Sequence, residues 1–253
     1  MAAPSHLNGL AAVVFDFDGV LANSEPLHLR VLQQVLATVG VTLSTDEYYA
    51  RYLGYSDHDA LLQLAADRDL RWDEPTVARL TSTKTERFRE LAGRESVLFP
   101  DAAACVEQVA AAVPVAIASG ALREEIELML EPSGLRSLFS VVVGADDTPR
   151  SKPAPDPYER AFRLLHETGR LDSTARPEHA VAIEDSPWGI QSARTAGLHT
   201  IALTTSYGPD QLGEADLVLP GLSALTLDTL ARVVGEGARG KGQGARGERG
   251  KGI

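Results

Sequence analysis

The stretch that most constrains the fold is a short apolar run from Ala11 to Phe15, which stops abruptly at Asp16, Asp18 and Gly19. Continuous apolar runs of this length are typical of strands buried on both faces, whereas aspartate is a poor strand residue. The run therefore predicts a buried strand whose carboxyl end carries chemistry. Asp16 and Asp18 are two residues apart, so we expect them to share one face. Close carboxylates repel each other unless a cation lies between them, and Mg²⁺ prefers such oxygen ligands. The alternative is a strand end followed by an ordinary turn, so this pair needs partners elsewhere in the chain.

From residue 99 onward, helical and extended patterns alternate. Strands are predicted over 113–118, 141–143, 180–183, 198–203 and 217–219, and helices over 101–112, 121–131, 156–168, 187–196 and 223–234. This alternation predicts an α/β fold, a doubly wound parallel sheet covered by helices on both faces. Ligands of such sheets bind beyond the carboxyl ends of the strands, where Asp16, Ser119 and Asp185 stand.

The segment from residue 20 to residue 97 shows helical patterns only. They start at Ser24-Glu25-Pro26 and continue near 45–53, 57–66 and 74–92, which together predict a small inserted helical bundle. We therefore expect a catalytic core formed by residues 1–19 and 98–234, and a helical cap over 20–97. The Gly-, Arg- and Lys-rich tail, 235–253, has almost no apolar side chain and is predicted to be disordered.

Composition limits the partners. A formal net charge of −11 argues against nucleic acid or an anionic membrane as the main partner. No signal peptide and no apolar run of about 18 residues is evident. The single Cys105 excludes an internal disulfide and fits a reducing compartment, so we expect a cytoplasmic protein. Nothing in the sequence fixes the oligomeric state, and we expect a monomer or a weak homodimer.

Four segments carry residues suited to one chemistry. They are Asp16-Phe-Asp18-Gly19, Ser119-Gly120, Lys152-Pro-Ala-Pro-Asp-Pro-Tyr158 and Glu184-Asp185-Ser186-Pro-Trp-Gly189-Ile190. A phosphate monoester repels nucleophiles, so its catalyst must neutralise charge and hold the attacking atom in line. A carboxylate such as Asp16 suits the nucleophile, and a neighbouring one such as Asp18 suits the acid and base. These residues therefore suit phosphoryl transfer from a small phosphorylated metabolite.

The remaining candidates of these segments each have a second interpretation. Asp185 can bind a metal, with Glu184 in the inner or second shell, or the pair can simply begin a helix. The hydroxyl of Ser119, with the main-chain amides at Gly120, can hold phosphoryl oxygens, or it can cap the following helix. Lys152 supplies local positive charge on a loop stiffened by prolines, although a loop lysine is usually solvated.

The four motifs, in this order, resemble those of the haloacid dehalogenase superfamily, in the branch of β-phosphoglucomutase-like enzymes and sugar-phosphate phosphatases. The resemblance covers Leu10 to about Leu219 and implies a Rossmann-like core with a helical cap. It implies that Mg²⁺ is held by Asp16 and Asp185 and by the main-chain carbonyl of Asp18, with Glu184 in the inner or second shell. It also implies that Lys152 stabilises the transferring phosphoryl group.

Two cap residues are further candidates for substrate binding. His28, in Ser-Glu-Pro-Leu-His, matches a cap-entry histidine of the resembled branch, but it can equally be a polar residue on the first cap helix. Lys84 lies on a later cap helix, where it can reach substrate or belong to a solvated face.

The type of reaction is also predicted by resemblance. Dehalogenases of this group lack the second aspartate of the first motif, so Asp18 favours phosphoryl chemistry. In the mutases a cap arginine follows a Gly-x-Ser turn, whereas Asp57 follows Ser56 here, although Lys84 could substitute for the arginine. We therefore predict a phosphatase that hydrolyses a small phosphate monoester, a sugar phosphate, through an aspartyl-phosphate. The alternatives are a phosphosugar mutase and a catalytically idle protein that binds a phosphometabolite.

Overall fold

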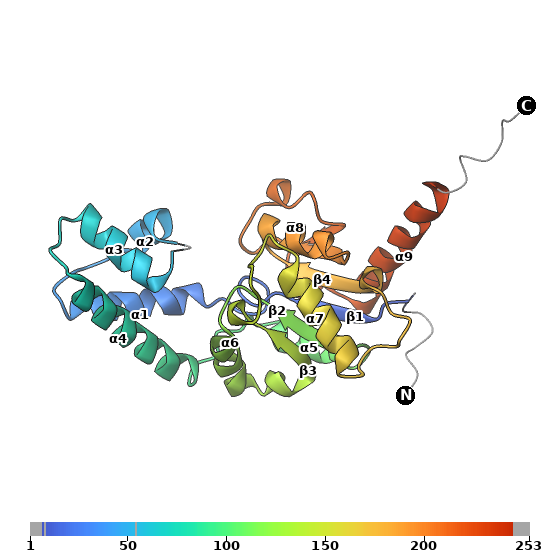
Figure 1. The fold of residues 1–253 in the computed structure, drawn as a ribbon, viewed down its shortest axis with the longest axis horizontal. Helices are drawn as coiled ribbons and strands as arrows, with labels where there is room; N and C mark the ends of the chain where they lie inside the picture. The colour runs from blue at the N-terminus through green and yellow to red at the C-terminus, as the bar shows by residue number, and fades with distance from the viewer. Residues whose placement is uncertain (1–6, 8, 54, 245–253) are drawn as a thin grey trace, which may run out of the picture. The chain divides into compact units, whose positions relative to one another are not determined.

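The computed structural model describes residues 7, 9–53 and 55–244, with side chains described as far as residue 236. A parallel sheet of six strands forms the core of one unit, in the order β3-β2-β1-β4-β5-β6. The strands are β1 (Ala12–Phe15), β2 (Val115–Ala118), β3 (Phe139–Val143), β4 (Ala180–Glu184), β5 (His199–Leu203) and β6 (Leu217–Leu219). The predicted doubly wound α/β class is confirmed, and the apolar run that ends in Asp16 lies at the centre of the sheet (Figure 1).

Both faces of the sheet are buried along the central strands β1, β2 and β4, which explains why these strands are apolar as far as Glu184. Alternate residues of the central strands, Ala12 and Val14 among them, pack against Tyr158 and Phe162 of α7 (Asp156–Glu167). Helix α8 (Pro187–Thr195) belongs to the same cluster. Helices α5 (Ala102–Ala110) and α9 (Leu227–Gly244) contact the sheet but contribute no residue to the described part of this cluster. They cover the side to which the other alternate residues point.

Three helix boundaries of this unit differ from the prediction. Helix α6 (Arg123–Leu130) begins two residues later than expected, after a turn at Ser119. Helix α9 begins at Leu227 because Thr226 Oγ1 accepts a hydrogen bond from the Thr229 amide at the helix start. It then continues to Gly244, so residues 235–244 are helical where disorder was predicted. Five of these ten residues are glycine, so intrinsic propensity does not explain the extension, which continues a helix that is already nucleated. The predicted disorder over 245–253 lies outside the described residues.

The chain divides into two compact units, Met1–Asn23 with Leu98–Ile253, and Ser24–Val97. The second unit begins at Ser24 rather than Val20, because Ala22 still pairs with Leu98 in the first unit. We call the second unit the cap and the first the core. In the described part of the chain, no helix has both the length and the apolar character needed to cross a membrane.

The cap is built from four helices with short connections. They are α1 (Glu25–Ala37), α2 (Thr45–Arg51), α3 (Asp57–Asp67) and α4 (Glu74–Ala92). Helix α4 packs against both α1 and α3. The side chains of Ser44, Ser56 and Asp73 each accept a main-chain N–H in the first turn of the helix that follows, which fixes three of the four helix starts.

Two neighbouring leucines test how the cap is held together. Leu61 is 0% exposed and Leu62 is 41% exposed, on the same turn of α3. Leu61→Ala is expected to lower the free energy of unfolding by about 2–5 kcal/mol through the cavity it leaves. Leu62→Ala should lower it by about 0.5 kcal/mol or less. Urea unfolding of both variants measures the difference, and equal losses would contradict the packing described for α3.

Candidate active site

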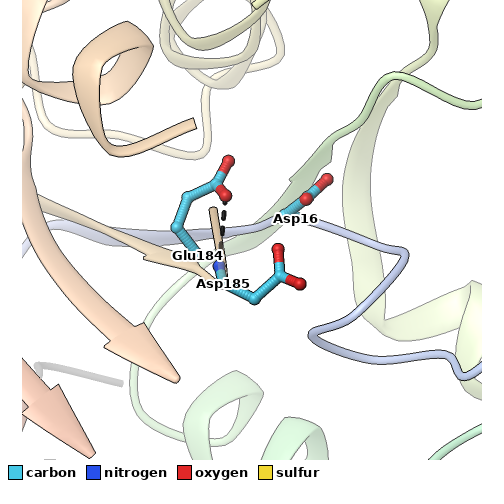
Figure 2. Close-up of side chains that lie close together, drawn as sticks. All are labelled: Asp16, Glu184 and Asp185. Carbon is cyan, nitrogen blue, oxygen red and sulfur yellow. Dashed lines mark hydrogen bonds between the residues drawn. The ribbon is translucent and has the colours of Figure 1, made fainter. Parts of the chain in front are cut away.

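The sheet register brings carboxylates from two distant segments together. Phe15 of β1 is level with Ile183 of β4, and the Asp16 amide donates a 2.9 Å hydrogen bond to the Ile183 carbonyl oxygen. Asp16 therefore stands beside Glu184, the last residue of β4, and Asp185 follows directly. Figure 2 shows the three carboxylates converging at this edge of the sheet. One oxygen of each lies within 4.8 Å of the others, and all three residues are buried.

Lys152 supplies the positive charge at this cluster. Its Nζ lies 2.6 Å from Glu184 Oε1 and 2.8 Å from Asp16 Oδ1. The loop that carries it is tied to α8, because Ser192 Oγ donates a 2.6 Å hydrogen bond to the Ala154 carbonyl oxygen. The alternative of a solvated loop lysine is wrong, since its side chain is 10% exposed. Three carboxylates against one ammonium leave a formal charge of about −2 in a buried site.

The pKa values reflect this imbalance. Burial raises the pKa of Asp16 well above its ordinary value; Lys152 opposes the shift, while Glu184 and Asp185 add to it. Burial also raises the pKa of Asp185 to about 6, against the hydrogen bond from Ser206. For Lys152, burial lowers the pKa, but the carboxylates of Asp16 and Glu184 outweigh it and raise the pKa above its ordinary value. The cluster thus holds a stable cation and carboxylates that lack sufficient countercharge.

The residues present fit a hard divalent cation. The cluster offers only carboxylate oxygens, which such ions prefer, and two added positive charges would balance the formal charge. Although Lys152 is near, Asp16 Oδ1 is buried and receives no well-directed hydrogen bond from the described residues. A metal ion would satisfy that oxygen and reverse the upward pKa shifts. The group is Asp16, Glu184 and Asp185, and the carboxylate of Asp18 is not part of it.

Two glycines let the carboxylates lie where they do. Gly19 has a φ of +78°, and a Cβ there would fall 1.9 Å from Asp185 Oδ2. Gly189 lies in the first turn of α8, where a Cβ would fall 1.9 Å from Glu184 Oε1 and 2.0 Å from Oε2. The Glu184 carboxylate thus lies directly against the start of α8, where the positive end of the helix dipole favours negative charge. Glycine is needed at both positions because an acidic side chain lies so close to the backbone that a Cβ would overlap it.

Glu184 is held by donors at both of its oxygens. Oε1 accepts hydrogen bonds of 2.6 Å from Lys152 Nζ and from the hydroxyl of Tyr158, and Oε2 accepts from the Asp185 amide and from Ser186 Oγ, each at 3.2 Å. Ser186 also caps α8 by accepting the Gly189 amide. The helix-start interpretation therefore holds for Ser186, but it accounts for only part of the position of Glu184.

Ser119 directly follows β2, which neighbours β1 in the sheet. It is buried, and its Oγ accepts a 3.1 Å hydrogen bond from the Ala121 amide. The alternative that Ser119 caps the following helix is wrong, because the N-cap of α6 is Leu122. Gly120 is exposed, and a Cβ there would meet nothing within 4 Å. The phosphoryl-binding role of this turn stays a prediction.

The two candidates in the cap lie together. Lys84 is 2% exposed, so the solvated-face alternative is wrong. Its Nζ lies 2.7 Å from Asp57 Oδ1 and 2.6 Å from His28 Nδ1, and the His28 ring stacks on Phe88 with centroids 4.0 Å apart. Burial, together with the charge of Lys84, lowers the pKa of His28 to about 3, so the imidazole is neutral and accepts at Nδ1. We call these residues the cap cluster.

The family model described as haloacid dehalogenase-like hydrolase matches residues 13–203. The chain belongs to that family, which confirms the resemblance predicted from the four motifs. Phosphatases of this family generally use a metal ion, consistent with the acidic cluster.

Individual relatives are similar along most of their length. Protein CbbY of Rhodobacter capsulatus is 30% identical in an alignment 233 residues long that covers 85% of this chain and 95% of the relative. Fructose-1-phosphate phosphatase YqaB of Escherichia coli is 27% identical over 191 residues, covering 76% and 95%. The crystal structure of CbbY from Rhodobacter sphaeroides in complex with phosphate matches with a TM-score of 0.68 and 27% identity, covering 85% and 96%. These similarities agree with the predicted phosphoric monoester hydrolase activity.

Two functional contacts were missed from the sequence. Tyr158 was quoted within the Lys152 segment without a role, and Asp57 was noted as a departure from the mutases but not as a partner of Lys84. Both contacts join residues far apart in the chain, so spacing gave no signal. A tyrosine on an apolar helix face, six residues after Lys152, is the one hint that the sequence offers.

Gly189→Ala tests whether the position of the Glu184 carboxylate requires a residue without a Cβ at position 189. Alanine in a helix is ordinarily more favourable than glycine by up to about 1 kcal/mol. Here the added methyl group must displace the Glu184 carboxylate, so we expect a loss of about 1–3 kcal/mol in thermal or urea unfolding.

Gly208→Ala is the matched control, because a Cβ at Gly208 meets nothing within 4 Å and its φ of −71° suits alanine. We expect it to leave stability within about 0.5 kcal/mol of wild type. A Gly189→Ala variant as stable as this control would contradict the placement of Glu184.

Proposed function

We propose that this protein is a Mg²⁺-dependent phosphatase that hydrolyses a small phosphate monoester, a sugar phosphate, through an aspartyl-phosphate on Asp16. The observation that carries the proposal is the buried cluster of three carboxylates and Lys152 at the carboxyl edge of β1 and β4. Membership of a hydrolase family and similarity to a phosphatase named for a sugar phosphate support it.

The proposed reaction uses the two aspartates in turn. A carboxylate oxygen of Asp16 attacks phosphorus, and the bond from phosphorus to the leaving alcohol breaks. Asp18 gives the departing alcohol oxygen its proton. It then takes a proton from a water molecule whose oxygen attacks phosphorus, so that the bond to Asp16 breaks and phosphate leaves. The enzyme is thereby returned to its starting state.

The other residues hold charge in place. Asp16 and Asp185 would bind Mg²⁺, with Glu184 beside them and the Asp18 main-chain carbonyl as a further ligand. The bound ion would neutralise phosphoryl oxygens as well as the carboxylates. Lys152 pairs with Asp16 and faces the site where negative charge develops during transfer. The Ser119 hydroxyl and the amides of its turn would hold the phosphoryl oxygens that Lys152 does not reach.

The cap cluster bears on the choice between phosphatase and mutase. A mutase needs cationic residues for a second phosphate, and Lys84 was the candidate to replace the missing arginine. The carboxylate of Asp57 already lies 2.7 Å from its ammonium, so the positive charge of Lys84 is neutralised within the cap. This contact favours the phosphatase over the mutase. Substrate contacts of His28 and Lys84 stay a prediction, and they would involve groups that carry little net charge.

The proposal predicts Mg²⁺-dependent phosphate release from sugar phosphates. The test is a phosphate-release screen across sugar phosphates, phosphoglycolate and nucleotides, with a coupled mutase assay on β-glucose 1-phosphate. We expect release of phosphate without isomerised sugar, and loss of activity when EDTA removes the metal. Isomerised sugar without net phosphate release would favour the mutase.

Asp16→Asn supplies the control for this screen. The amide is close in shape but is a far weaker nucleophile, so turnover should fall by at least about 10⁴-fold. Retained hydrolysis would rule out Asp16 as the nucleophile. A wild-type protein that binds phosphorylated metabolites but hydrolyses none of them would favour the catalytically idle alternative.

A further inference from the structure

Tyr158 is a fully buried residue of α7 whose hydroxyl is directed at the acidic cluster. The hydroxyl donates a 2.6 Å hydrogen bond to Glu184 Oε1, the oxygen that also accepts from Lys152 Nζ. The tyrosine must be the donor, because an ionised carboxylate can only accept. Tyr158 therefore contacts the group that anchors Lys152.

The same side chain also contacts Lys152 itself. The Lys152 ammonium lies 5.1 Å from the centre of the Tyr158 ring, within the range of a cation–π contact. The ring packs in the core cluster beneath the sheet with Ala161, Phe162 and Leu165. Packing alone would be served equally by phenylalanine, so it does not explain why a hydroxyl is buried at this position. A buried hydroxyl is costly unless it is hydrogen-bonded, and Glu184 is its acceptor here.

We propose that Tyr158 is a positioning residue, whose hydroxyl fixes the Glu184 carboxylate so that Lys152 spans Glu184 and Asp16. Two donors on Oε1 hold that oxygen toward Lys152 and Tyr158, and leave Oε2 as the oxygen with the longer contacts. Without the hydroxyl, Glu184 can rotate and Lys152 can follow it away from Asp16. The effect on turnover rests on the proposed function, whereas the effect on geometry does not.

Tyr158→Phe removes the hydroxyl and keeps the ring. Loss of a group that orients a metal ligand typically costs about 10–100-fold in metal affinity or activity. We expect Mg²⁺ affinity, measured by isothermal titration calorimetry, to fall by about that factor, and kcat to fall similarly. KM should change by less than about threefold, because interactions specific to the transition state appear in kcat rather than in KM.

Tyr52→Phe is the matched control. Tyr52 is also buried, and its hydroxyl donates a 2.9 Å hydrogen bond to Asp67 Oδ2 inside the cap. Both variants lose one tyrosine-to-carboxylate hydrogen bond, so both should lose similar stability in thermal unfolding. Only Tyr158→Phe should change Mg²⁺ affinity and kcat. If Tyr158→Phe and Tyr52→Phe had the same Mg²⁺ affinity and the same kcat, the proposal would be overturned.

A crystal structure of the Tyr158→Phe protein separates this inference from the proposed function. We expect Glu184 to rotate and Lys152 Nζ to move out of contact range of Asp16. An unmoved Lys152–Glu184 pair would overturn the positioning role even if the enzyme is a phosphatase. A displaced pair in the variant, together with a wild-type protein that releases no phosphate, would leave the positioning role intact and refute the proposed function instead.

Discussion

The excess of buried negative charge at the edge of β1 and β4 is the constraint on which the rest of the site depends. Burying one carboxylate is costly, and burying three near each other is tolerated only where compensating groups are fixed in place. Lys152 compensates one charge, the start of α8 and the Tyr158 hydroxyl stabilise Glu184, and Gly19 and Gly189 leave room for close approach. What is left uncompensated matches a divalent cation. The fold therefore holds an excess of negative charge that a bound divalent cation can neutralise.

Much of this arrangement could be predicted from the sequence, because the information lies in local patterns. An apolar run that ends in Asp16, and another that ends in Glu184 and Asp185, identify two strand ends. Parallel strand order then brings strand ends to one edge of the sheet. The hydrogen bond from the Asp16 amide to the Ile183 carbonyl oxygen places the ends of these two strands side by side, as the sequence pattern predicts.

The contacts that the sequence could not supply depend on three-dimensional packing. The Tyr158–Glu184 and Lys84–Asp57 pairs join residues on different elements. Neither the spacing nor the type of one residue indicates which residue is its partner. The start of α6 was misplaced because the Ser119 turn continues for several residues before Leu122. The length of α9 was underestimated because glycine content outweighed the helix-forming residues between the glycines. The residues suited to catalysis were easier to predict than the residues that position them, because the positioning contacts depend on how the elements pack.

The core and the cap contain different kinds of charged groups. The core contains the groups suited to phosphoryl transfer, and the cap contains a buried lysine whose charge its own aspartate cancels. One fold can host many different functions, so the fold of these two units does not by itself identify the substrate.

Locating the metal tests the central claim most directly. Crystals of the protein soaked with Mn²⁺, which has the ligand preferences of Mg²⁺ and scatters anomalously, would show where the ion binds. The account predicts one strong anomalous peak in contact with the carboxylates of Asp16 and Asp185. A peak elsewhere, with none between these two residues, would contradict it.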